Sequence, residues 1–150
     1  MEKNIEKAVD LFVNKGFNCA QAVLSSHCEE YGLQEDIAKK LACGLGAGIG
    51  YSGEICGAVS GAVLLIGLKY GSYKEYETEP KYKTYKLAKE LLNNFKKEYG
   101  TVNCTELIKY DLGNPEEYSK AKEAGVFKEL CPLFIKKAIE LAEEILNRNK

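Results

Sequence analysis

The stretch from Glu54 to Gly71 reads Glu-Ile-Cys-Gly-Ala-Val-Ser-Gly-Ala-Val-Leu-Leu-Ile-Gly-Leu-Lys-Tyr-Gly, and it decides the fold that we expect. Its apolar residues follow one another without a polar face, so a helix here would be buried on all sides. Small residues recur at a spacing of four, which leaves flat faces for the close approach of neighbouring helices: Gly57 and Gly61, and Ala58 and Ala62. The stretch therefore predicts a buried, glycine-rich central helix.

The rest of the chain is typical of one all-helical domain over residues 1–150. With 45% apolar and 29% charged residues, a chain of 150 residues can bury its own core. It has neither a sustained alternation of apolar and polar residues nor an Asn-Gly or Asp-Gly hairpin turn. We expect a first helix that stops near Gly16, helices over about 19–31, 34–43, 54–71, 85–99, 103–110 and 115–124, and a last one from about 131. The apolar periodicity of this last helix predicts its inner residues: Phe134, Ile135, Ala138, Ile139, Ala142 and Ile145. The class is an all-α, single-domain bundle of seven or eight helices.

Charge and hydropathy exclude several classes of partner. The 21 basic and 22 acidic residues give a formal charge of -1 without a basic block, so we expect no nucleic acid and no anionic membrane as a partner. The first twelve residues lack the apolar core of a signal peptide, and the apolar run 58–68 is shorter than the about 20 residues of a membrane span. We therefore expect a cytoplasmic protein, in which six cysteines indicate metal binding or redox chemistry rather than structural disulfides.

Four of these cysteines fall at predicted helix starts. The segments Asn18-Cys-Ala-Gln21 and Asn103-Cys-Thr-Glu106 share one pattern, with Asn as the N-cap, Cys at the first helical position and Gln or Glu at the third, which approximates a capping box. Cys131 precedes a proline, and because proline favours the first helical position, we expect Cys131 to be the N-cap. Cys56 opens the buried helix, where unpaired amides and the helix dipole should lower the pKa of its thiol.

The order of the helices suggests that these four thiols meet. If short connections make successive helices antiparallel, the second, fourth, sixth and eighth run the same way, and their starts gather at one end of the bundle. Four adjacent thiolates repel one another unless a cation joins them, such as a 2Fe-2S or 4Fe-4S cluster or a zinc ion. Without metal, pairs of thiols could instead form a reversible disulfide, although no Cys-x-x-Cys motif is present.

Cys19, the segment Cys56-Gly-Ala-Val-Ser-Gly61, Cys104 and Cys131 together resemble the C-GCAxxG-C-C family of redox-active proteins. A related domain of split-Soret cytochromes holds an iron-sulfur cluster. The resemblance implies a helical fold and a cluster or redox site at these four cysteines, used in electron transfer with a redox protein partner that the sequence does not identify. The chain has no Cys-x-x-Cys-His segment, so we do not expect haem.

The remaining cysteines and glycines receive plainer interpretations. We expect Cys28, out of phase with Cys19 on the same helix, to be a packing residue, and Cys43 to be buried beside the glycine-rich loop unless it approaches the site as a fifth thiol. The loop Gly48-Ile-Gly-Tyr-Ser-Gly53 fits the letters of a dinucleotide fingerprint but follows a helix instead of a strand. We expect it to fold tightly around the site and to donate amide hydrogen bonds to sulfur.

The tyrosines near the central helix are expected to cover the core or a subunit interface: Tyr70, Tyr73, Tyr76, Tyr82 and Tyr85. These tyrosines are also compatible with a homodimer in which the site lies near the subunit interface. The sole histidine, His27, is expected to be exposed or capped rather than a ligand. No general acid or base constellation stands out among the many Glu and Lys residues, so the sequence indicates no catalytic residue and leaves enzymatic activity undecided.

Overall fold

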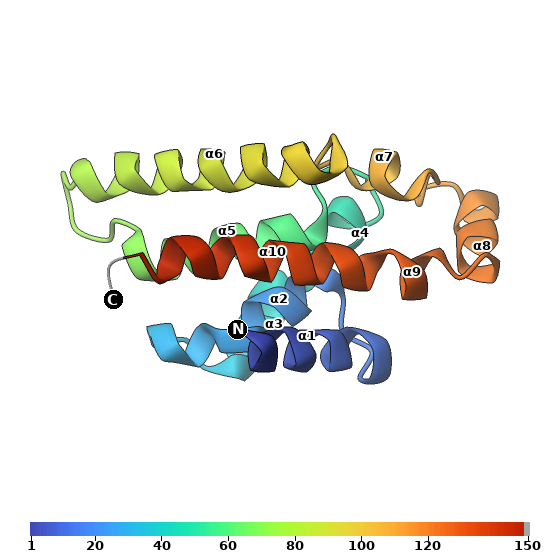
Figure 1. Ribbon diagram of the computed structural model, residues 1–150, viewed down its shortest axis with the longest axis horizontal. Coiled ribbons are helices and arrows are strands. Elements are labelled where there is room, and N and C mark those ends of the chain that lie inside the picture. Colours follow the sequence, from blue (N-terminus) through green and yellow to red (C-terminus); the bar gives the residue numbers. More distant parts are fainter. Residues whose placement is uncertain (149–150) are drawn as a thin grey trace.

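A computed structural model describes residues 1–148 and shows an all-helical protein (Figure 1). Helices make up 74% of it, and it has no strands within the described residues. Eight of the ten α-helices in the described part of the chain have five or more residues, which agrees with the expected number: α1 (Glu2–Asn14), α2 (Cys19–His27), α3 (Glu35–Ala42), α5 (Gly57–Tyr70), α6 (Glu79–Tyr99), α7 (Cys104–Ile108), α8 (Pro115–Glu123) and α10 (Cys131–Leu146). The shorter elements are η1 (Cys28–Tyr31), η2 (Cys43–Leu45), α4 (Gly46–Ile49) and α9 (Val126–Glu129). No helix within residues 1–148 is both long and apolar enough to cross a membrane.

Helix α5 is the uniformly apolar stretch, and it packs against α2, α6 and α10. Its glycines have no room for a side chain where they face α2. A Cβ atom on Gly61 would lie 2.9 Å from the carbonyl oxygen of Ala20 and 3.0 Å from the Cβ of Val23. A Cβ on Gly57 would lie 3.1 Å from the backbone nitrogen of Ala20. The close approach of a neighbouring helix that the glycine spacing predicted is therefore confirmed.

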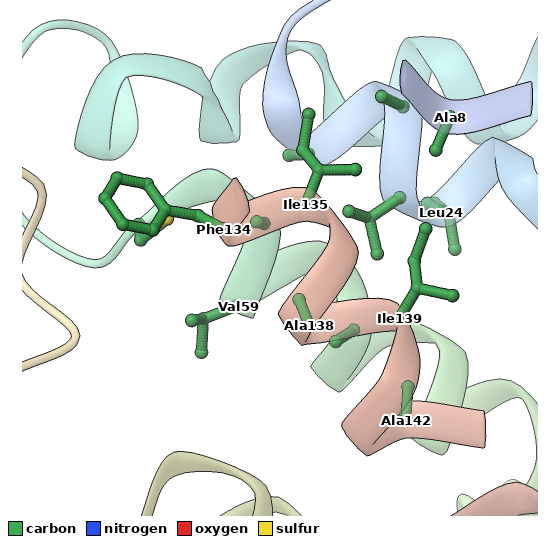
Figure 2. Packing of buried hydrophobic residues seen from close by; sticks show 14 of the residues in the cluster. Ala8, Leu24, Val59, Phe134, Ile135, Ala138, Ile139 and Ala142 are labelled. Atoms are coloured by element: carbon green, nitrogen blue, oxygen red, sulfur yellow. The ribbon is translucent and has the colours of Figure 1, made fainter. Parts of the chain in front are cut away.

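Helix α10 presents the apolar face that its sequence predicted. The expected inner residues are all buried: Phe134, Ile135, Ala138, Ile139, Ala142 and Ile145. Figure 2 shows Ile135 and Ile139 on the side of α10 that faces Ala8 of α1 and Leu24 of α2, while Val59 of α5 lies on another side. In Figure 1, α6, α10 and α1 lie in successive layers, and α7, α8 and α9 gather at the end where α10 begins.

The start of α10 differs from the prediction by one residue. Leu130 is its N-cap, and Cys131 is its first helical residue rather than the cap. The short α9 ends directly before, so Leu130 already has near-helical dihedral angles (φ -96°, ψ -45°) and the chain enters α10 without an extended cap residue. The thiol of Cys131 thus occupies the same helical position as those of Cys19 and Cys104.

The tyrosines that follow α5 do not cover the core. Tyr73, Tyr76, Tyr82 and Tyr85 are 60% to 98% exposed, so that part of the prediction was wrong. Only Tyr70 of the five packs against the core, and its hydroxyl donates to the carbonyl of Ile145 at 3.3 Å. On α6 the buried residues are Leu91 and Phe95. Tyr85 precedes Leu91 by six positions, which at about 3.6 residues per turn places it roughly 120° away around the helix, on the solvent side.

Candidate functional site

The four cysteines at helix starts line one cavity of about 170 Å³. Cys19, Cys104 and Cys131 are the first residues of α2, α7 and α10, and Cys56 is the N-cap of α5. The prediction that these four helix starts gather at one place is confirmed by this geometry. The remaining lining is mostly apolar and comes from α1, α4, α7, α8, α9, α10 and the loops between them, and it includes Phe12, Leu107, Leu112, Phe127 and Phe134.

A short antiparallel bridge between Ile55 and Asn103 holds two of the cysteines beside each other. The amide of Cys56 donates to the carbonyl of Val102 at 2.7 Å, and the amide of Cys104 donates to the carbonyl of Glu54 at 2.6 Å. Because each bond joins a cysteine of one segment to the other segment, the starts of α5 and α7 cannot shift separately. No strand pattern in the sequence predicts this pairing.

Asn18 fixes the start of α2 as predicted. Its Oδ1 accepts from the amide of Gln21 at 2.9 Å, and the Gln21 Oε1 accepts from the Asn18 amide at 3.0 Å, which completes the capping box. The Asn18 Nδ2 also donates to the carbonyl of Cys43 at 2.8 Å. One side chain thereby joins the Cys19 helix start to the loop that closes the other side of the site.

Asn103 caps α7 with only half of the predicted box. Its Oδ1 accepts from the amide of Glu106 at 2.9 Å. The Glu106 carboxylate does not return to the cap backbone but accepts from the Thr101 hydroxyl at 3.2 Å. That hydroxyl in turn accepts from the Asn103 amide at 3.0 Å, so the threonine takes the place of the glutamate in the box.

Burial raises the pKa of the Cys56 thiol to about 12, which corrects the expectation of a lowered value. The helix start does supply the expected donors, because the amides of Ala58 and Val59 hydrogen-bond to the sulfur and act to lower the pKa. The thiol is 4% exposed, however, and the loss of water around a thiolate outweighs two amide donors. Cys56 is therefore a neutral thiol at neutral pH when no cation is bound.

The other three thiols are linked by their mutual influence. A hydrogen bond between Cys19 and Cys131 raises the pKa of Cys19 well above its ordinary value and lowers that of Cys131, so Cys19 keeps the shared proton. Burial, followed by the charge of Cys131, raises the pKa of Cys104 to about 11. Cys131 is accordingly the thiol of the four that ionises first, with the Cys19 S–H donating to its sulfur.

The four sulfurs surround the cavity rather than one point within it. Within residues 1–148 no group of three or more His, Cys, Asp or Glu side chains is arranged to hold a metal ion. A cavity needs a volume of about 10–15 Å³ to hold one water molecule, whereas this cavity has a volume of about 170 Å³. The arrangement can receive a group larger than a single ion, or allow the thiols to react with one another.

Cys28 and Cys43 lie outside the cavity. Cys28 is fully buried in the hydrophobic core, which confirms its expected packing role. Cys43 is exposed, so the expectation of burial was wrong; its carbonyl, not its sulfur, takes part in the site through Asn18. His27 was expected to be exposed or capped but is 5% exposed, with Nδ1 at 2.7 Å from the Ser26 hydroxyl.

The glycine-rich loop forms an unusual left-handed turn. Five consecutive residues, 47–51, have φ between 54° and 68°, and three of them are not glycine: Ala47, Ile49 and Tyr51. The left-handed region costs an L-residue roughly 1–2 kcal/mol, so this turn is strained. Its amides bond within the loop, for example Glu54 to the carbonyl of Gly48 at 2.9 Å. The amide bonds to Cys56 that we expected from the loop come instead from the first turn of α5.

Aromatic residues that the sequence did not indicate complete the cavity wall. Tyr51 and Tyr118 both line it, and their rings meet edge to face with centroids 5.5 Å apart. Tyr118 continues to Phe127 at 5.6 Å. The only sequence signal was the position of Tyr51 inside the glycine-rich loop; the face of α8 that carries Tyr118 reads as an ordinary charged surface helix.

Fold and site together define a class of small all-helical proteins in which four helix-start cysteines line one cavity. The chain belongs to the family described as "Putative redox-active protein (C_GCAxxG_C_C)", whose model matches residues 17–145 and so includes all four cysteines. The motif in the family's name has Gly directly before Cys, whereas in this chain Cys56 directly precedes Gly57. Membership in the family therefore rests on the whole matched stretch. No curated protein and no solved structure matches the chain.

Proposed function

We propose that this protein binds an iron-sulfur cluster, 2Fe-2S or 4Fe-4S, through Cys19, Cys56, Cys104 and Cys131 and uses it for electron transfer. The observation that carries the proposal is the single cavity shared by these four sulfurs. In this reading residues 1–150 form one domain, and α5 is the central helix of its bundle. A bound cluster supplies a one-electron redox couple.

The donor set and its surroundings suit such a group. Thiolates are the usual protein ligands of iron-sulfur clusters, and a cluster with four of them carries about two negative charges when oxidised. Four helix starts face this position, and the start of a long helix carries roughly half a positive charge. The amides of Ala58 and Val59 already donate to the Cys56 sulfur, and hydrogen bonds of this kind tune a cluster's potential.

The raised pKa values of Cys19, Cys56 and Cys104 mean that a bound metal has to displace protons from these thiols. These thiols are neutral without one, because burial and the neighbouring sulfurs oppose their ionisation. A cysteine has to lose its thiol proton to bind a metal, so metal binding releases protons and becomes tighter as the pH rises. Once ionised, four buried thiolates without a cation would repel one another across the cavity.

The test is a visible spectrum of protein purified without oxygen, with iron, acid-labile sulfide and zinc measured on the same sample. We expect a brown protein with iron and sulfide in matching amounts, and loss of the colour in Cys56→Ser and Cys104→Ser. Matched controls are Cys43→Ser, at an exposed sulfur, and Cys28→Ser, at a buried sulfur outside the cavity. Both should keep the full colour.

Colourless protein that remains without iron after anaerobic reconstitution would refute the cluster. The zinc content then decides whether the thiols hold a structural zinc ion in an interaction module, which would be redox-silent. Colour that persists in all four single cavity variants would instead place the metal elsewhere.

A second candidate is a thiol-disulfide protein without metal, and the hydrogen bond between Cys19 and Cys131 favours it. The Cys131 thiolate could attack a disulfide of an incoming partner, and the Cys19 thiol could then resolve the mixed disulfide. Counting free thiols before and after mild oxidation of the metal-free protein tests this candidate. An unidentified redox protein partner, a homodimer and a cytoplasmic location remain predictions of the sequence.

A further inference from the structure

Among the described residues that line the cysteine cavity, Tyr51 alone is exposed. It is 54% exposed, whereas the other lining residues are buried or half-buried. Its side chain therefore borders both the cavity and the solvent, as a residue at the entrance does.

Two neighbours hold the Tyr51 side chain in that position. Its ring packs edge to face on Tyr118, with an interplanar angle of 85°. The influence of Tyr118, through its charge first and hydrogen bonding second, raises the pKa of Tyr51, so the Tyr51 hydroxyl stays neutral beside this ring. Tyr118 is itself packed against Phe127, so the pair closes onto a fixed aromatic wall.

The backbone under this side chain is strained rather than relaxed. Tyr51 has φ 67° and ends the left-handed turn that begins at Ala47. The turn is kept by its own bonds, including Ser52 to the carbonyl of Ile49 at 3.0 Å. On its outer side, a Cβ on Gly113 would lie 3.2 Å from the Tyr51 carbonyl oxygen, so the 111–114 loop also packs closely on it. Strained non-glycine residues persist only where the surroundings hold them, and they concentrate at functional sites and switches.

We propose that Tyr51 is the gate of the cysteine cavity: its ring, latched on Tyr118, limits which thiol-reactive molecules and oxidants reach Cys19, Cys56, Cys104 and Cys131. Small reagents pass when the ring swings out, and bulky ones are held back. This proposal rests on the proposed function in one respect, which is that the four cavity cysteines are the reactive groups of the protein. It holds whether they carry a cluster or work as thiols.

The experiment measures alkylation of each cysteine in the metal-free, reduced, full-length protein by peptide mass spectrometry. Iodoacetamide is the small reagent, and fluorescein maleimide is the bulky one. Cys104 is the main readout because it is half-buried in the cavity wall. Exposed Cys43 gives the rate of an open thiol, and fully buried Cys28 reports unfolding.

Tyr51→Gly is the decisive variant, since glycine removes the ring and accepts the positive φ without strain. We expect the bulky reagent to label Cys104 about tenfold faster or more, with Cys28 still protected and a smaller change for iodoacetamide. The matched control is Tyr73→Ala, at a tyrosine that is 85% exposed and outside the cavity. It should change nothing.

An unchanged Cys104 rate in Tyr51→Gly, or an equal rise in Tyr73→Ala, would overturn the gate. If Cys28 becomes reactive as well, the variant has opened globally, and Tyr51→Asn decides instead. Asparagine also removes the ring, and it tolerates the positive φ with less backbone freedom than glycine. Faster Cys104 labelling with Cys28 protected supports the gate, and no acceleration refutes it.

These outcomes do not depend on metal. A protein that proves colourless and free of iron loses the cluster, while its labelling rates still decide the gate. A brown protein with unaltered labelling in both variants keeps the cluster and loses the gate.

Discussion

The thiols of Cys19 and Cys131, at the starts of α2 and α10, are hydrogen-bonded to each other across the cavity wall. The two residues lie near opposite ends of the chain, and the packing of α10 against α2 brings them together. The cluster and the thiol-disulfide proposals differ most clearly at this pair. In the cluster proposal both sulfurs bind iron, whereas in the thiol-disulfide proposal an oxidant joins them in a disulfide bond.

We predict that Cys19–Cys131 is the first disulfide to form in the metal-free protein. With oxidised glutathione as the oxidant, the two thiols give one S–S bond, and glutathione leaves as two thiols that carry away the protons and electrons. Non-reducing peptide mapping should show this link before any other cavity pair. Cys19→Ser should leave Cys131 as a mixed disulfide with glutathione, and a first link between Cys56 and Cys104 would contradict the prediction.

The raised pKa of Cys56 predicts a loss of stability at alkaline pH in the metal-free protein. Its pKa is about 12 in the folded state against an ordinary value of 9.0, so the folded state holds the proton more tightly than the unfolded state. This stabilisation is complete below pH 9 and is lost as the pH rises towards 12, up to about 4 kcal/mol in all. Urea unfolding at pH 8 and pH 10 should show a smaller alkaline loss for Cys56→Ser than for the parent. Equal losses would show that the thiol is not buried as described.

Two glycines of α5 should respond in opposite ways to alanine. Gly61→Ala should destabilise the protein by about 2 kcal/mol, because the new Cβ would meet the Ala20 carbonyl oxygen at 2.9 Å. Gly67→Ala should stabilise it by about 0.5–1 kcal/mol, since nothing lies within 4 Å of its Cβ position and alanine favours a helix. Thermal unfolding of both variants checks the pair. Equal signs would mean that α2 and α5 are not in the described contact.

The asparagine caps should differ in their effect on the site. Asn18→Ala should cost about 2 kcal/mol or more, because it removes the capping box and the bond to the Cys43 carbonyl, and it should speed alkylation of Cys19. Asn114→Ala removes the cap of α8, a helix without a cysteine, and should cost about 1 kcal/mol while leaving the alkylation rate of Cys19 unchanged. Chemical unfolding together with peptide mass spectrometry measures both. Equal alkylation rates in the two variants would show that Asn18 acts only as a cap.

Local rules in the sequence were enough to locate most helices and four site residues. Asn18 and Asn103 followed by cysteine marked two helix starts, and the apolar periodicity of 131–146 marked the buried face of α10. These signals are short-range, because a cap or a helical stripe depends on residues within one or two turns. The same short range explains the one-residue error at Cys131, where the preceding α9 altered the cap.

Burial was the property that local rules predicted least well. Cys43 was expected to be buried and is exposed, and His27 was expected to be exposed or capped and is buried, with its Nδ1 beside the Ser26 hydroxyl. Cys56 has the amide donors that its position at a helix start predicted. Its pKa is nevertheless raised, because α2, α7 and α10 exclude water from the thiol. The exposure of a side chain depends on elements distant in the chain, and no pattern around the residue encodes it.

By itself, the sequence determined that the chain is helical, where its helices begin, and that four cysteines stand at those beginnings. Only the tertiary structure decided that the four meet in one cavity, that Cys19 and Cys131 share a proton, and that Tyr51 stands at the entrance. The physical reason is that capping and periodicity act through neighbours in the chain. Thiol acidity and access depend on the solvent that distant helices remove.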